Sequence, residues 1–283
     1  MYESLLDRLS ATRMVAIDLD GTLLDDESRL TDRTAAVLDR AIEGGLRIVI
    51  ATGRSLRDTR HLLGELSDRV TTIAFNGALI QEDSKLLHIN PLLSDQVNDI
   101  SRFFQNRRAL PVFYDEHGGR YLIPPADPQD MTRALLETYR SSFEAIDDLS
   151  ALDGARIMRI SVWDTQERTA QLQGVFTAEF GDRYTTYLFE FTMWIFEVLH
   201  ADSTKGCALR RLAMSSGVPL HRVAAIGNHL NDVSMMRVAG TGIAVENALP
   251  AVKDAADFVI AANTEEGVAR LVEEILANRA GGS

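Results

Sequence analysis

Two aspartates separated by one residue follow a short apolar run near the start of the chain. The stretch Met14–Leu24 reads MVAIDLDGTLL, with carboxylates at Asp18 and Asp20. Like charges this close repel, so either a cation lies beside them or one of the two holds a proton. Carboxylates act as nucleophiles, proton carriers or ligands of hard cations, which makes this pair a candidate catalytic centre.

The apolar run is typical of a buried β-strand, and side chains two residues apart in a strand project to the same side. Asp18 and Asp20 are therefore expected to point together into the crevice at the carboxyl end of a parallel strand. Gly21 would let the chain turn sharply there and bring its backbone close to an anion.

Three further polar motifs follow predicted strands or begin a predicted helix. Ala51–Arg54 (ATGR) offers a hydroxyl, a glycine N–H and a helix N-terminus to a phosphate oxygen. Ser203–Gly206 (STKG) places Lys205 at the start of a helix as a fixed cation, and Gly227–Asp232 (GNHLND) is rich in oxygen ligands. An all-oxygen site favours Mg²⁺. With the metal and Lys205 neutralising charge, one aspartate can attack phosphorus while the other protonates the leaving oxygen.

The outer thirds of the chain alternate strand and helix signals. The predicted strands are 14–19, 46–52, 70–75, 222–227, 242–245 and 257–260, and the predicted helices are 31–43, 55–66, 204–216, 232–239 and 265–278. Strands separated by helices favour right-handed crossovers and a parallel sheet. We therefore predict an α/β core with a Rossmann-like, doubly wound parallel sheet.

The middle third has a different pattern. It indicates a hairpin in 111–125 around Gly118-Gly119, a strand in 155–163, two strands in 182–199, and helices in 129–142 and 166–180. This mixture predicts an inserted α+β domain with a partly antiparallel sheet. The expected division is a discontinuous core of residues 1–90 and 197–283 with an insertion of residues 91–196.

Composition narrows the class of partner. The 283 residues carry a formal net charge of −12, which argues against nucleic acid and against an anionic membrane surface. One cysteine, Cys207, allows no intramolecular disulfide and suits a cytoplasmic location. The first residues lack the apolar segment of a signal peptide, and no apolar run reaches the length of a membrane helix. Oligomeric state is unknown at this stage.

The four motifs, in this order, resemble those of the haloacid dehalogenase-like (HAD) phosphohydrolase superfamily, and within it the Cof-type sugar phosphatases. Supporting similarities lie at 75–78 (FNGA), 245–248 (VENA) and 257–272. The resemblance covers almost the whole chain. It implies a cap domain inserted between the second and third motifs, and a Mg²⁺-dependent phosphatase acting on small phosphorylated metabolites such as sugar phosphates or phosphorylated cofactors.

The resemblance also implies a role for individual residues. Asp18 would be the nucleophile that forms an aspartyl-phosphate, Asp20 the general acid and base, and Lys205 the cation that neutralises Asp18 and the phosphate. The implied phosphate-binding residues are Leu19, Thr52, Gly53, Lys205 and Asn231. The implied metal ligands are Asp18, Asp20 through its backbone carbonyl, Asn228 and Asp232.

The chain departs from the family pattern at Gly227-Asn228, where the family usually has Gly-Asp. An amide oxygen still binds Mg²⁺ but brings no charge, so we expect weaker metal affinity. Two alternatives stay open: a phosphotransferase or phosphomutase on the same fold, and a ligand-binding protein whose catalysis has decayed. Asn228 is the only support for the second.

Several side chains have more than one interpretation. Arg54 could cap a helix, pair with an acid or contact substrate. Tyr114 and Arg120, near the predicted hairpin, are further candidates for substrate specificity. Cys207 is expected to be a small buried side chain and not a nucleophile.

Overall fold

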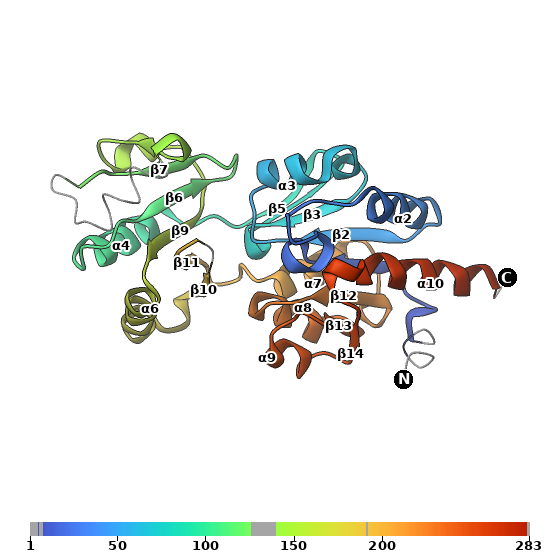
Figure 1. Ribbon diagram of the computed structural model, residues 1–283. Helices are drawn as coiled ribbons and strands as arrows, with labels where there is room; N and C mark the ends of the chain where they lie inside the picture. Colours follow the sequence, from blue (N-terminus) through green and yellow to red (C-terminus); the bar gives the residue numbers. More distant parts are fainter. Residues whose placement is uncertain (1–4, 6–7, 126–139, 191, 282–283) are drawn as a thin grey trace. The chain divides into compact units, whose positions relative to one another are not determined.

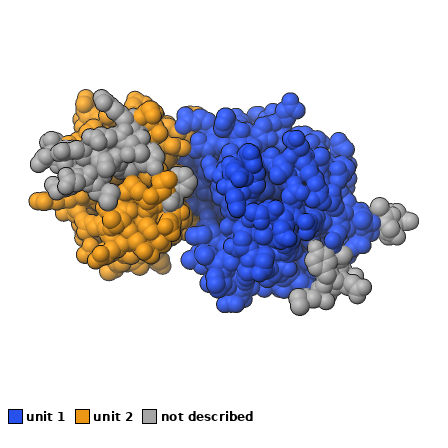
Figure 2. Space-filling model, in the orientation of Figure 1, with its two compact units in different colours: residues 1–89, 204–283 blue, residues 90–203 orange. Residues whose placement is uncertain are grey.

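The computed structural model describes residues 5, 8–125, 140–190 and 192–281. The chain divides into two compact units, residues 1–89 with 204–283 (unit 1) and residues 90–203 (unit 2), coloured separately in Figure 2. The second boundary lies beyond the expected residue 197. The reason is that the last strand of unit 2, β11 (Trp194–His200), continues through that position.

Unit 1 is built on a sheet of eight strands in the order β14-β13-β12-β1-β2-β3-β4-β5. Its strands are β1 (Met14–Ile17), β2 (Arg47–Ala51), β3 (Thr71–Ala74), β4 (Leu79–Glu82), β5 (Lys85–Ile89), β12 (Val223–Gly227), β13 (Thr241–Val245) and β14 (Phe258–Ile260). The strands from β14 to β3 are parallel. Every residue of β1 is buried, which explains why it reads as a continuous apolar run.

Helices cover this sheet on both faces. Helices described in unit 1 include α2 (Asp32–Glu43), α3 (Leu56–Leu63), α7 (Lys205–Ser215), α8 (Val233–Val238), α9 (Pro250–Lys253) and α10 (Gly267–Gly281). The strand order reverses at β1, so right-handed crossovers place helices on opposite faces. Accordingly, α2 packs with α10 and α7 packs with α8 (Figure 1). The predicted doubly wound α/β fold is confirmed.

Two strands of unit 1 were not predicted. β4 and β5 form an antiparallel hairpin that extends the sheet beyond β3. Their turn residues, Asp83 and Ser84, both have positive φ, as a tight hairpin turn of the mirror-image kind requires. This turn usually contains glycine or asparagine, so an Asp-Ser pair gives a weak signal in sequence.

Unit 2 contains a sheet of six strands in the order β10-β11-β9-β6-β7-β8. Its elements are α4 (Ser94–Gln105), β6 (Val112–Asp115), β7 (Arg120–Leu122), β8 (Glu144–Ala145), β9 (Ile157–Asp164), α6 (Gln166–Phe180), β10 (Tyr184–Glu190) and β11. All strand pairs are antiparallel except β7 with β8.

The expected α+β composition of unit 2 agrees with this arrangement. β6 and β7 form the predicted hairpin, and β10 and β11 are the two strands predicted in 182–199. The helix predicted at 129–142 lies almost wholly outside the described residues. Helices α4 and α6 contribute to a core of interlocking phenylalanines, in which Phe103, Phe176 and Phe196 participate.

Candidate active site

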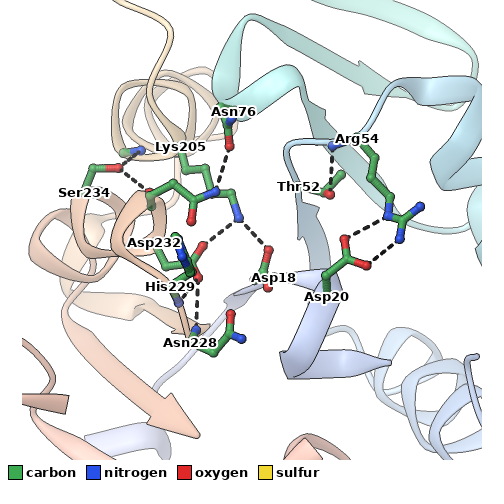
Figure 3. Close-up of polar contacts among 12 residues, drawn as sticks. Asp18, Asp20, Thr52, Arg54, Asn76, Lys205, Asn228, His229, Asp232 and Ser234 are labelled. Carbon is green, nitrogen blue, oxygen red and sulfur yellow. Dashed lines mark hydrogen bonds and ion pairs between the residues drawn. The ribbon is translucent and has the colours of Figure 1, made fainter. Parts of the chain in front are cut away.

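The predicted functional residues of unit 1, together with Asn76, come together at the carboxyl ends of its parallel strands (Figure 3). Asp18 follows β1, Thr52 follows β2, Asn76 lies just after β3, and Asn228 follows β12. These four strands are neighbours in the sheet and run parallel, so their carboxyl ends meet. This is the edge at which open α/β sheets bind ligands.

A buried lysine joins two of these groups. The Lys205 ammonium donates to Asp18 Oδ1 and to Asp232 Oδ1, each at 2.6 Å. The side chains of Lys205 and Asp232 are fully buried, and that of Asp18 is 9% exposed. Removing charges from water is costly, so such a group persists only when its charges are paired and hydrogen-bonded. One cation here serves two carboxylates.

Local structure holds this lysine and its partners in place. Lys205 is the first residue of α7, whose N-cap, Thr204, accepts the N–H of Cys207. The second oxygen of Asp232 accepts the backbone N–H groups of Asn228 and His229, both at 3.0 Å. Both oxygens of Asp232 therefore have protein partners, which points to an orienting role for this carboxylate in place of the metal-ligand role that the resemblance implied.

A glycine makes this loop geometry possible. A Cβ atom on Gly227 would lie 2.5 Å from the Asp232 carboxylate, closer than any real contact allows. The GNHLND motif thus needs glycine at its first position so that its last residue can fold back over the strand end. Asp232 thus stabilises the loop to which it belongs, through hydrogen bonds to the backbone of that loop.

The charges in this group shift one another's pKa values. Burial, and then the neighbouring charge of Asp232, raise the pKa of Asp18 to about 7, against the opposing effect of Lys205. For Lys205, burial works against the charged form, but Asp18 and Asp232 outweigh it and the pKa of the ammonium is raised. Lys205 therefore stays positive, and Asp18 can lose its proton in the neutral range.

Asp20 has a different partner. The Arg54 guanidinium donates from Nε to Asp20 Oδ2 at 2.8 Å and from Nη2 to Asp20 Oδ1 at 2.6 Å. This is a bidentate ion pair, with side-chain exposures of 32% for Arg54 and 46% for Asp20. Of the three interpretations of Arg54 from the sequence, pairing with an acid is the one that the structure shows.

Asp18 and Asp20 both lie at the site, on the same side of the strand end in Figure 3, but the strand does not continue through them as expected. β1 ends at Ile17, and residues Leu19–Leu23 form a turn that contains Gly21 at φ +72°. The alternation of a strand therefore does not apply to the two aspartates. Each carboxylate pairs with a different cation, Asp18 with Lys205 and Asp20 with Arg54 (Figure 3). These cations offset the repulsion between the two carboxylates that the sequence led us to expect.

The candidate phosphate-binding residues lie beside this pair of carboxylates. Thr52 is buried, and its hydroxyl accepts the backbone N–H of Arg54 at 3.1 Å. Asn231 donates from Nδ2 to Asn76 Oδ1 at 2.9 Å. A Cβ on Gly53 would lie 3.2 Å from the same Asn76 oxygen. The side chain of Leu19 is in the hydrophobic core, so only its backbone is available to a ligand.

Asn76 was assigned no role from the sequence, yet it connects these motifs. Its backbone N–H donates to the Thr52 carbonyl at 3.0 Å, and its side chain is fully buried. Its Nδ2 has no hydrogen-bond partner among the described residues. The signal available in sequence was the Asn-Gly pair after β3, since Asn76 takes the left-handed conformation, with φ of 53°.

The oxygen atoms at the carboxyl ends of these strands fit a hard cation. Asn228 Oδ1 is buried and has no hydrogen-bond partner within the described part of the chain, as expected of an oxygen kept for a ligand. Among the described residues, no three His, Cys, Asp or Glu side chains gather as metal ligands. The available set is instead mixed: the Asp18 carboxylate, the Asp20 carbonyl and the Asn228 amide, all oxygens of the kind that Mg²⁺ prefers.

The two specificity candidates of unit 2 lie on neighbouring strands, Tyr114 on β6 and Arg120 on β7. Tyr114 is buried, with the Arg159 guanidinium 4.1 Å and the Arg120 guanidinium 6.0 Å from its ring centroid. Arg159 also pairs with Glu197 at 2.5 Å. Burial raises the pKa of Glu197, and Arg159 opposes that shift.

Comparison with known proteins identifies the class. The model of the haloacid dehalogenase-like hydrolases matches residues 15–272. Phosphatase YwpJ of Bacillus subtilis strain 168 is 29% identical, over 93% of this chain and 100% of its own length. A 5-amino-6-(5-phospho-D-ribitylamino)uracil phosphatase, YwtE, of the same strain is 28% identical, over 94% of this chain and 99% of its own length.

A solved structure agrees with these relatives. A haloacid dehalogenase-like hydrolase from B. subtilis superposes with a TM-score of 0.78 at 26% identity, covering 93% of this chain and 99% of the other. The chain belongs to the haloacid dehalogenase-like hydrolase family, in its Cof-type group. The family and enzyme class predicted from the sequence are thereby confirmed. Within the described residues, none of the helices has the length and apolar character needed to cross a bilayer.

Proposed function

We propose that this protein is a Mg²⁺-dependent phosphatase that hydrolyses small phosphorylated metabolites through an aspartyl-phosphate intermediate. The observation that carries this proposal is the buried Lys205, which holds Asp18 at 2.6 Å at the end of the central strand. A carboxylate fixed beside a permanent cation is a prepared nucleophile for an anionic phosphate ester.

The reaction proceeds in two displacements. Asp20 is the ionised partner of Arg54 at rest, so it takes up a proton from solvent as the substrate binds. An Asp18 oxygen then attacks phosphorus, the bond from phosphorus to the ester oxygen breaks, and Asp20 gives that proton to the departing alkoxide. Asp20, now a carboxylate, then takes a proton from water as the water oxygen attacks the aspartyl-phosphate. Inorganic phosphate leaves and Asp18 is regenerated as a carboxylate. Thr52, Gly53, Asn231 and the Leu19 backbone hold the phosphoryl group.

The mixed oxygen set described above would hold Mg²⁺, with Asp18, the Asp20 carbonyl and Asn228 as ligands. When bound, Mg²⁺ draws negative charge from the phosphoryl oxygens. Asp232 keeps Lys205 and the Asn228 loop in position through its two oxygens. Asp18 is thereby held for attack even though Asn228 supplies no charge.

The relatives support a small phosphorylated substrate. YwtE is named for a phosphorylated ribitylaminouracil, and an HMP-PP phosphatase of Enterobacter sp. strain 638 is 28% identical over 84% of this chain. The net charge of −12 makes nucleic acid and anionic membranes poor partners, and the single cysteine suits the cytoplasm. We assign substrate specificity to unit 2, with Tyr114 and Arg120 as its candidate residues.

The test is phosphate release from a panel of sugar phosphates and phosphorylated cofactors, with Mg²⁺ or with EDTA. Asp18→Asn is expected to abolish release in a protein that still folds, because the amide is no nucleophile. Release without Mg²⁺, or by Asp18→Asn, contradicts the proposed mechanism. Product analysis separates hydrolysis from transfer: an isomerised sugar phosphate in place of inorganic phosphate would support a phosphomutase.

A further inference from the structure

We propose that Arg54 is the positioning residue of Asp20: its guanidinium holds the carboxylate in the orientation needed for proton transfer to and from the reacting oxygens. This inference rests on the proposed function, because it takes Asp20 as the proton carrier. It assigns to Arg54 an effect on catalysis that is exerted through Asp20 and not through contact with the substrate.

The contact itself has the geometry of an orienting clamp. Two guanidinium N–H donors of Arg54 meet the two oxygens of Asp20, at 2.6 and 2.8 Å (Figure 3). A bidentate pair of this kind fixes the plane of the carboxylate as well as its position. A single hydrogen bond would leave the carboxylate free to rotate.

Arg54 can act as a clamp because its own backbone is held on both sides. Its N–H donates to Thr52 Oγ1 at 3.1 Å, and its carbonyl accepts the N–H of Phe75 at 3.0 Å. The next residue, Ser55, is the N-cap of α3 and accepts the N–H of Asp58. The guanidinium therefore extends from an anchored point between β2 and α3.

Asp20 needs such a clamp more than Asp18 does. Its side chain is 46% exposed, and an exposed side chain changes rotamer freely unless a partner restrains it. An ion pair this exposed adds little to folding stability, so its main consequence is the orientation of Asp20. Proton transfer requires the donor and acceptor atoms to be in near-contact geometry, and small misplacements are costly in rate.

The first experiment compares two leaving groups in Arg54→Ala. Glucose 6-phosphate releases an alkoxide that needs a proton, whereas p-nitrophenyl phosphate releases a stable phenolate. We expect kcat/KM for glucose 6-phosphate to fall on the order of 10–100-fold, and clearly less for p-nitrophenyl phosphate. Arg54→Lys should restore part of the loss. Equal losses with both substrates would mean that Arg54 binds the phosphate itself, and would overturn the proposal.

The second experiment is a double-mutant cycle with Asp20→Asn. If Arg54 acts only through Asp20, adding Arg54→Ala to Asp20→Asn should change kcat/KM by less than about threefold. A further loss as large as that of Arg54→Ala alone would overturn the proposal. Arg60→Ala, which removes an exposed arginine from α3, is the matched control and should leave kcat/KM unchanged. The urea midpoint of Arg54→Ala should match that of the wild type.

Different outcomes would reject the phosphatase mechanism and the role of Arg54. Activity in Asp18→Asn, or a loss below about tenfold in Asp20→Asn, would reject the proposed phosphatase mechanism. If both of those variants behave as expected but the cycle is additive, the mechanism stands and the role of Arg54 is rejected.

Discussion

Lys205 and Arg54 each hold one of the two aspartates that follow β1, but in opposite surroundings. The pair of Lys205 with Asp18 is buried, with side-chain exposures of 0% and 9%, whereas the pair of Arg54 with Asp20 is exposed at 32% and 46%. A buried charge left without its partner strongly destabilises the fold, while exposed pairs contribute little to stability. The buried pair should therefore couple folding to catalysis, and the exposed pair should affect catalysis alone.

Replacing Lys205 by methionine is expected to have the largest effect. It leaves Asp18 and Asp232 buried without their cation, and breaking a buried pair in this way costs about 3–5 kcal/mol. Urea unfolding in EDTA should show that loss, and phosphate release should fall to the level of Asp18→Asn. The control Lys85→Met, on the exposed edge strand β5, should change neither quantity. Wild-type stability in Lys205→Met would contradict the proposed difference between the buried and the exposed pair.

The pH dependence of stability tests whether the buried Asp18 contributes to folding. The pKa of Asp18 is raised from 3.8 to about 7 in the folded protein, chiefly by burial. A carboxyl with a raised pKa stabilises the fold below its unfolded pKa, and this contribution is lost as the pH rises through about 7. In EDTA, the wild type should therefore lose roughly 2 kcal/mol relative to Asp18→Asn between about pH 5 and pH 8.

Unfolding midpoints at several pH values in this range measure that difference. Asp254→Asn, at an exposed position in the same unit, should follow the wild type. If the wild type and Asp18→Asn keep a constant difference across the range, Asp18 is not the group that links stability to pH.

The buried residues of the site could be predicted because they follow the ends of strands. Asp18, Thr52 and Asn228 follow parallel strands that are neighbours in the sheet, so the order of motifs was enough to bring them together. The partner of Asp20 was not predictable in this way. It depends on the turn at Leu19–Leu23, which ends the strand alternation, and on the direction of one arginine side chain.

Elements without a distinctive local signal were missed for related reasons. The hairpin of β4 and β5 turns at Asp83-Ser84 and lacks the usual glycine. Cys207 was expected to be buried and is exposed on α7, because a helix has both a packed and a solvent-facing side and a lone cysteine does not show which side it occupies. Pairings between side chains distant in sequence depend on packing, which a single sequence does not contain.

The departure at Asn228 gives the smallest expected effect, and one in which stability and binding move in opposite directions. Asn228→Asp adds a charge to a buried oxygen position that has no hydrogen-bond partner within the described residues. Mg²⁺ affinity should rise about tenfold, since the charge of the ligand set governs affinity for hard cations. Without metal, the added charge lies near Asp18 and Asp232, so the free energy of unfolding should fall by about 1 kcal/mol. Titration calorimetry with Mg²⁺ and urea unfolding in EDTA measure the two changes.

A matched variant separates this local effect from net charge. Asn98→Asp adds the same charge at an exposed position inside α4 of unit 2 and should change neither Mg²⁺ affinity nor stability. Unchanged Mg²⁺ affinity in Asn228→Asp would show that this oxygen does not bind the metal. The buried part of the site would then consist of Lys205 and its two carboxylates alone. Asn228 would contribute only its backbone hydrogen bond to Asp232, which stabilises the loop.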